Sequence, residues 1–276
     1  MSIYYNQEGE VEAALGAVQK ALHAVCRDFE NENIFTNPEL DNYNSWNYLF
    51  GALMAKGQYL YAQYLLTDDD QALATSFETY QLGVTLIDTL RKQLSYTTIN
   101  DMGRKWLKAY EGGIKTAIAI YNLKNDERFL ETAFRFAEES KAISLEQQLA
   151  EINARQFSGI PDSLINHELA LKSEIAYFEK ETKAAEQRND SSAMSIYHNS
   201  LFTRKREYEQ LMAELKADFP AYFSLKYERI TASSSEIGSR LTNSETAFIE
   251  YFEGDSSLYV FYIINGELAV HYVRRN

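Results

Sequence analysis

"TAFIEYFEGDSSLYVFYIINGELAVHYVRRN", residues 246–276, decides the fold, because its pattern is that of strands whereas the residues before it follow a helical pattern. It predicts strands over 247–252, 258–264 and 267–274, and its Asn265-Gly266 pair is a strong signal for a two-residue hairpin turn. Residues 258–264 are apolar on both faces, as in a strand that is covered on both sides. Three strands cannot cover both of their own faces. Either helices cover one face or the sheet is incomplete, and we expect an incomplete sheet.

Apolar residues before this stretch recur at spacings of three and four, as in Leu49, Leu53 and Leu60. Such spacing places them on one face of a helix and predicts a mainly α protein. The predicted helices span residues 8–30, 42–66, 69–93, 100–123, 127–153, 163–188, 192–217 and 234–241. The sequence therefore predicts a helical repeat, then a long antiparallel helical hairpin, then a short C-terminal antiparallel β-meander.

Two helical pairs repeat each other at a distance of 57 residues. The matches include Tyr64 with Tyr121, Leu73 with Leu130, Phe77 with Phe134, and Tyr80 with Ala137. Self-similarity of this kind is typical of stacked helical pairs that cannot bury their apolar faces alone. The spacing resembles tetratricopeptide repeats, although the period exceeds the usual length of about 34 residues and the closing proline is absent. The alternative is an unrelated helical bundle with a coincidental spacing.

The helical hairpin is indicated by two apolar stripes. One follows Met194, Tyr197, Leu201, Tyr208, Leu211 and Leu215, and the other follows Leu164, Leu171, Ile175 and Phe178. Stripes with these steps suit two antiparallel helices that pack as a short coiled coil. The connector over 187–192 is polar and short enough to reverse the chain.

The order of motifs between the repeats and the strands resembles bacterial CHAT-family proteins, in which tetratricopeptide repeats are joined to a caspase-like peptidase domain. The matching pieces are the Glu138–Ala142 run, the Phe157–Asp162 turn, the hairpin and the "FPAYFSLKY" segment over 219–227. The resemblance extends from about residue 40 to the end. It implies helical repeats over 1–153, a linker and hairpin over 154–232, and a short helix with the first strands of an incomplete CHAT domain over 233–276. The family's catalytic His and Cys motifs do not occur here, so the resemblance assigns no catalytic residue.

The composition limits which binding partners and which cellular compartment can be expected. A formal net charge of −13 and a pI near 4.9 argue against nucleic-acid binding, which depends on clustered Lys and Arg. No signal segment and no apolar run of membrane-spanning length occur in these residues. A single cysteine fits a reducing compartment, so we expect the cytoplasm.

Few residues of the sequence are of types that carry out chemistry. Cys26 lies three residues from His23, so the two share a helix face and could form a nucleophile pair or half a metal site. The alternative, which we favour, is a buried cysteine that acts as a small apolar residue. Asp68–Asp70 lacks the ligand spacing of a calcium loop and indicates a helix start. The sequence predicts no cofactor, no metal site and no enzyme in these residues.

Two interaction sites are predicted. Arg104, Lys108 and Lys115 recur on one side of a helix, and a basic stripe in a repeat groove favours an acidic or carboxylate-terminated peptide. The alternative is an ordinary solvated helix face. Leu268, Val270 and Tyr272 lie on the last strand, whose open edge predicts self-association as a two-fold pair. The alternative is a monomer whose strands fold back on the helical hairpin.

Two functions follow as hypotheses. The first is a non-catalytic interaction scaffold, the repeat and linker region of a caspase-like peptidase, which binds a protein or peptide partner and relays to the peptidase domain. The second is a free-standing helical repeat adaptor without an associated peptidase.

Overall fold

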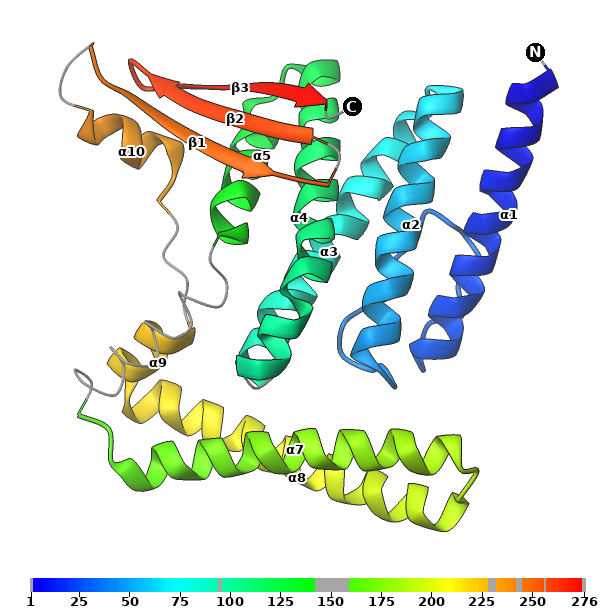
Figure 1. The fold of residues 1–276 in the computed structure, drawn as a ribbon, viewed down its shortest axis with the longest axis vertical. Coiled ribbons are helices and arrows are strands. Elements are labelled where there is room, and N and C mark those ends of the chain that lie inside the picture. Colours follow the sequence, from blue (N-terminus) through cyan, green and yellow to red (C-terminus); the bar gives the residue numbers. More distant parts are fainter. Residues whose placement is uncertain are drawn as a thin grey trace. The chain divides into compact units, whose positions relative to one another are not determined.

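The computed structural model describes residues 2–93, 96–141, 159–227, 232–241, 245–255 and 257–274. These residues form mainly helices and a three-stranded antiparallel sheet (Figure 1), which confirms the predicted fold class. The helices are α1 (Ser2–Val25), α2 (Trp46–Thr67), α3 (Asp70–Gln93), α4 (Tyr96–Lys124), α5 (Glu127–Ser140), α7 (Asp162–Gln187), α8 (Ser191–Asp218), α9 (Pro220–Tyr227) and α10 (Ser234–Arg240). The strands are β1 (Ala247–Glu253), β2 (Ser257–Ile264) and β3 (Glu267–Arg274).

The chain divides into two compact units. One contains the described residues of Met1–Asp88, Arg104–Lys141 and Thr231–Asn276, and so combines the repeat helices with the sheet. The other contains the described residues of Thr89–Gly103 and Ala142–Ile230, which include the helical hairpin. The domain limits predicted at residues 153 and 232 stay predictions.

Helix boundaries differ from the predicted ones where the backbone has other hydrogen-bond partners. The helix predicted to run to residue 30 ends at Val25, and α2 begins at Trp46 rather than at 42. The segment between them folds back on itself, because Arg27 donates its backbone N–H to the Asn42 carbonyl at 3.1 Å and Asn44 donates to the Val25 carbonyl at 2.9 Å. These backbone groups are therefore not available for helical bonds.

The 57-residue repeat extends to the geometry of the turns. Asp68 and Asn125 both adopt positive φ, of 55° and 52°, at the ends of α2 and α4. After each of them an aspartate accepts the backbone N–H two residues later, Asp69 from Gln71 at 2.9 Å and Asp126 from Arg128 at 3.1 Å. The two helical pairs therefore end and begin in the same way, as expected for copies of one unit.

Small residues let the repeat helices approach closely. A Cβ added at Gly112 would lie 2.2 Å from the Tyr80 ring, and one at Gly113 would lie 2.7 Å from the Phe136 ring. The same Tyr80 ring lies 2.9 Å from the position that a Cβ would take at Gly57. One buried tyrosine thus fills the space left by glycines of two helices, α2 and α4.

The sheet has the order β1-β2-β3. Its second turn places Asn265 and Gly266 at φ of 54° and 82°, so the predicted two-residue hairpin is confirmed. On one face, Tyr259, Phe261 and Ile263 of β2 are buried. Helices α5 and α10 contact the strands of this sheet, and Phe134 of α5 packs edge-on against Phe261 with ring centroids 5.9 Å apart.

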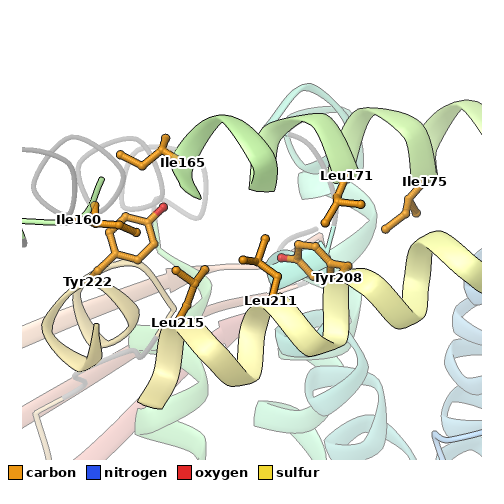
Figure 2. Packing of buried hydrophobic residues seen from close by; sticks show 8 residues of the cluster. All are labelled: Ile160, Ile165, Leu171, Ile175, Tyr208, Leu211, Leu215 and Tyr222. Atoms are coloured by element: carbon orange, nitrogen blue, oxygen red, sulfur yellow. The ribbon is translucent and has the colours of Figure 1, made fainter. Parts of the chain in front are cut away.

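The hairpin unit has its own apolar core (Figure 2), which α7, α8 and α9 share. Its buried members are Ile160, Ile165, Leu171, Ile175, Tyr208, Leu211, Leu215 and Tyr222. The predicted stripes are buried at Leu171, Ile175, Tyr208, Leu211 and Leu215, whereas Phe202 on the second arm is 70% exposed. The second arm ends at Asp218, one residue beyond its predicted end, and Pro220 begins a separate helix, α9, which is not among the predicted helices.

Candidate functional site

The predicted basic stripe lies on α4. Arg104, Lys108 and Lys115 are all exposed, and steps of four, three and four residues place Glu111 in the same row. In the described part of the chain, Arg104 and Lys108 take part in no ion pair. The stripe is therefore basic at one end and interrupted by a carboxylate toward the other. Sequence reasoning missed Glu111, although its place in the row could have revealed it.

The interrupted end of this stripe contacts the sheet. The Glu111 carboxylate accepts the backbone N–H of Asp255, in the turn between β1 and β2, at 2.9 Å. Gly254 permits this approach, since a Cβ there would lie 2.4 Å from the Glu111 carboxyl carbon. Lys115 places its Nζ 4.4 Å from the centre of the Tyr61 ring, a cation–π contact between α4 and α2.

One residue from each predicted interaction site meets at a group of tyrosines. Tyr259 of β2 lies beside Tyr272 of β3, with ring centroids 6.1 Å apart. The pKa of Tyr259 is raised to about 12, first by burial and in smaller part by the negative forms of Glu111, Tyr61 and Tyr272, while a hydrogen bond with Ser257 lowers it. We call Tyr61, Glu111, Lys115, Tyr259 and Tyr272 the tyrosine junction. The structure thus brings Lys115 of the stripe and Tyr272 of the strand to one place.

The predicted edge is formed by β3, which pairs with β2 on one side only within the described sheet. The two-residue turn makes Ile264 and Glu267 a hydrogen-bonded pair. Along antiparallel strands, hydrogen-bonded pairs alternate with pairs whose backbone groups point outward. The backbone groups of Leu268, Val270 and Tyr272 therefore point away from β2. Between β1 and β2 the pairs alternate in the same way, because the Gly254 N–H donates to the Ser257 carbonyl at 2.9 Å.

The outer face of the sheet carries exposed large apolar side chains beside the polar Glu253, Glu267 and His271. By register, Ile249 and Tyr251 of β1 share this face with Ile264 of β2 and Val273 of β3. These four side chains are 51%, 59%, 42% and 51% exposed, in that order. Exposed apolar surface that is contiguous marks an interaction site more often than single exposed residues do. We call these four residues the outer sheet face.

A buried carboxylate connects the sheet to the last repeat helix. Glu250 of β1 forms an ion pair with Lys141, which also binds Glu138 at 2.8 Å. Burial raises the pKa of Glu250 and Glu138 adds to the increase, while Lys141 opposes it. Lys141 caps α5 with an extended backbone, so this helix ends at Ser140 and not at 153 as predicted. Residues 142–153 of that predicted helix lie outside the described residues.

Cys26 and His23 do not form the reactive pair that their spacing allowed. His23 directs Nε2 to the Asn31 carbonyl at 2.8 Å, and Cys26 is 3% exposed. Burial and the Asp41 carboxylate raise the pKa of the Cys26 thiol, which opposes the thiolate that a nucleophile needs. Among the described residues, no group of three or more His, Cys, Asp or Glu is arranged to hold a metal ion.

None of the helices in the described ranges combines the length and the apolar character that crossing a membrane requires.

Comparisons with protein-family models, with curated proteins and with solved structures find no match to this chain.

Proposed function

We propose that this chain is a non-catalytic interaction scaffold, the repeat and linker region of a CHAT-family caspase-like peptidase. It binds a protein or peptide partner through its helices and relays this to the peptidase domain through its sheet. The observation that carries the proposal is the outer sheet face, where four large apolar side chains on three strands are exposed.

The proposed cover of the outer sheet face is a layer of the peptidase domain itself. An apolar sheet face is stable when another layer packs on it. On the opposite face α5 and α10 already provide this layer. The motif that resembles the family supports the choice of occupant, because its Lys141 binds Glu250 in β1. The end of the repeat region is thereby tied directly to the sheet that the peptidase would share.

The proposed partner site is the exposed end of the stripe on α4, at Arg104 and Lys108, with Lys115 at the tyrosine junction. Two guanidinium or ammonium groups one turn apart suit an acidic or carboxylate-terminated peptide. We place the protein in the cytoplasm, because a free cysteine persists in reducing compartments. Without the peptidase layer, the β3 edge pairs with the β3 edge of a second copy, as an open edge favours.

The second candidate, a free-standing adaptor, is favoured by a different observation. The sheet belongs to the same compact unit as the repeat helices, as a local extension of a helical protein would. In this case the outer sheet face would bind an unrelated protein.

Photo-cross-linking in the cells from which the gene comes tests the proposal. p-Benzoylphenylalanine replaces Tyr251 on the outer sheet face, which is 59% exposed, or the control Tyr177 on α7, which is 53% exposed. We expect the Tyr251 position to cross-link to a segment that contains caspase-like His and Cys motifs, and the Tyr177 position not to do so. Cross-linking to an unrelated protein would support the adaptor. No cross-link from the Tyr251 position would contradict both.

A further inference from the structure

Residues 27–42, between α1 and α2, form an Ω-loop, which is a compact loop whose two ends lie side by side. Backbone hydrogen bonds close these ends, because Arg27 donates its N–H to the Asn42 carbonyl at 3.1 Å and Asn44 donates to the Val25 carbonyl at 2.9 Å. A loop that is closed in this way can open and close as one unit while the helices beside it stay in place.

Two side chains of the Ω-loop cover an apolar cluster of the first repeat helices. Ile34 and Phe35 pack against the cluster formed by Leu15 of α1, Leu60 of α2 and Ala72 of α3. The three cluster residues are at most 1% exposed while the Ω-loop is in place. Opening of the Ω-loop would therefore expose an apolar surface that three helices share.

The helices also hold the middle of the Ω-loop by polar contacts. Gln19 of α1, which is 2% exposed, donates Nε2 to the carbonyls of Asn31 at 2.6 Å and Asn33 at 3.0 Å. Lys56 of α2 is fully buried and donates Nζ to the Gln19 side-chain oxygen at 3.0 Å and to the Thr36 carbonyl. Lys56 therefore links both helices to the Ω-loop.

The Lys56 side chain is buried without a counter-ion. In the parts of the chain that the structure describes, no ion pair includes Lys56, and both of its acceptors are neutral. These two acceptors match the two N–H groups of a neutral amine, whereas an ammonium group has three. A buried charge without a partner is unfavourable, and burial accordingly lowers the pKa of Lys56 from 10.5 to about 8.

The other charged groups around the Ω-loop do not compensate the charge of Lys56. On α1, Lys20 is exposed and His23 directs Nε2 to the Asn31 carbonyl at 2.8 Å. On α3, the contact is neutral, because the Thr79 hydroxyl donates to the Asn37 side chain at 3.1 Å. The charged side chains of the Ω-loop all lie at exposed positions, namely Arg27, Asp28, Glu30, Glu32, Glu39 and Asp41.

We propose that the Ω-loop is a pH-sensitive lid, which closes over the apolar cluster of the first repeat helices when Lys56 is neutral and opens when Lys56 takes up a proton. Opening lets water reach the ammonium group, so the pKa of Lys56 returns from about 8 toward 10.5. The closed form is therefore most stable above pH 10.5 and loses stability as the pH falls toward about 8. This lid is separate from the stripe and the sheet of the proposed function.

Alkylation of Cys26 by iodoacetamide in the full chain measures the opening. Cys26 is the one cysteine of the sequence, is 3% exposed and pairs with Tyr43 at the closed ends of the Ω-loop. At each pH its rate is divided by that of the peptide acetyl-Ala-Val-Cys-Arg-Asp-amide, which cancels the ionisation of the free thiol. We expect this ratio to rise by about 30-fold from pH 9.5 to pH 7, because the pKa of Lys56 differs between the closed and the open form.

Matched variants assign the pH dependence to one residue. Lys56→Met and Lys56→Gln both remove the charge, and the second keeps N–H donors for the Ω-loop. In either variant the ratio should change by less than about twofold between the two pH values. His23→Gln should keep the full rise. Phe35→Ala removes an apolar contact of the lid, so it should raise the ratio by a similar factor at both pH values.

Urea at low concentration distinguishes the lid from global unfolding. The ratio at pH 7 should depend only weakly on urea, because a loop exposes little surface when it opens. The inference is overturned if the native ratio does not rise as the pH falls, if the rise persists without the Lys56 charge, or if it disappears in His23→Gln. A ratio unchanged by Phe35→Ala, or a urea dependence equal to that of global unfolding by circular dichroism, would overturn it as well.

Discussion

Lys141, at the end of the last repeat helix, forms an ion pair with Glu250 in the first strand, 109 residues further along the chain. The Glu250 side chain is 5% exposed and Lys141 is 44% exposed. Among the described residues, one Glu250 oxygen, Oε1, is buried without a hydrogen-bond partner. The contact therefore joins the repeats to the sheet through a carboxylate that the fold only partly satisfies.

Replacement of Glu250 by Gln should change how stability depends on pH. The folded pKa of Glu250 is raised, first by burial, so the fold favours the protonated form. The contribution of Glu250 to stability is therefore present at low pH and is lost as pH rises through its raised pKa. We expect Glu250→Gln to gain stability relative to the native chain between pH 4 and pH 7, measured by urea unfolding. An equal difference at both pH values would contradict this account.

Replacement of Lys141 by Met should destabilise the sheet, because it leaves the Glu250 carboxylate buried without its cation. We expect a loss of about 1–2 kcal/mol in the free energy of unfolding, below the value for a fully buried pair since Lys141 is partly exposed. Hydrogen exchange should accelerate in β1 but not in α7.

Glu168 should be the strongest single polar contributor to the hairpin unit. It is fully buried in α7 and accepts hydrogen bonds from Tyr222 at 2.7 Å and from Lys226 at 2.9 Å, both of α9. Burial alone would raise the pKa of Glu168, but Lys172, Lys226 and the Tyr227 hydroxyl lower it to about 2. Its contribution is therefore present above the ordinary value of 4.5 and is lost as pH falls toward about 2.

Glu168→Gln should therefore lower the free energy of unfolding at pH 7 by about 3 kcal/mol and release α9 from the hairpin. The matched control is Glu174→Gln, also on α7, whose side chain is 47% exposed and pairs with Arg204 at 2.8 Å. We expect the control to lose less than about 1 kcal/mol. Equal losses, or no faster hydrogen exchange in α9, would show that Glu168 does not hold this helix.

Gly112→Ala tests the close packing of the repeat helices. The added methyl group would lie 2.2 Å from the buried Tyr80 ring, so we expect a loss of about 1–3 kcal/mol in the free energy of unfolding. The control Gly51→Ala lies in α2, where no atom of the described residues is within 4 Å of the new Cβ. It should stabilise the chain by about 0.5–1 kcal/mol through helix propensity. Thermal unfolding of both variants measures these changes, and a change of the same sign in both would contradict the packing argument.

Local features of this fold could be predicted from the sequence. The 57-residue repeat predicted two copies of one helical pair, and in the structure Asp69 and Asp126 accept backbone N–H groups at equivalent helix starts. The Asn265-Gly266 pair predicted the second hairpin, because the turn needs positive φ at two consecutive residues and few other residue pairs adopt it. These signals lie within a few residues of the structure that they specify.

The candidate sites could be predicted only in part, because contacts distant in sequence complete them. The row that contains Lys108 was visible, but the role of Glu111 depends on Asp255, 144 residues later. A pattern in one helix carries no information about which turn will pack against it.

The central claim is that the β3 edge and the outer sheet face are protein-binding surfaces. Sedimentation velocity across a concentration series tests this claim most directly. We expect the 276-residue chain to self-associate as concentration rises. Val270→Pro removes an N–H that points away from β2, so it should abolish the association and leave the β2–β3 pairing intact by circular dichroism. Val273→Asp, on the outer sheet face, should leave an edge-to-edge pair in place. A chain that stays monomeric at every concentration, or a dimer that survives Val270→Pro with its sheet intact, would contradict the claim.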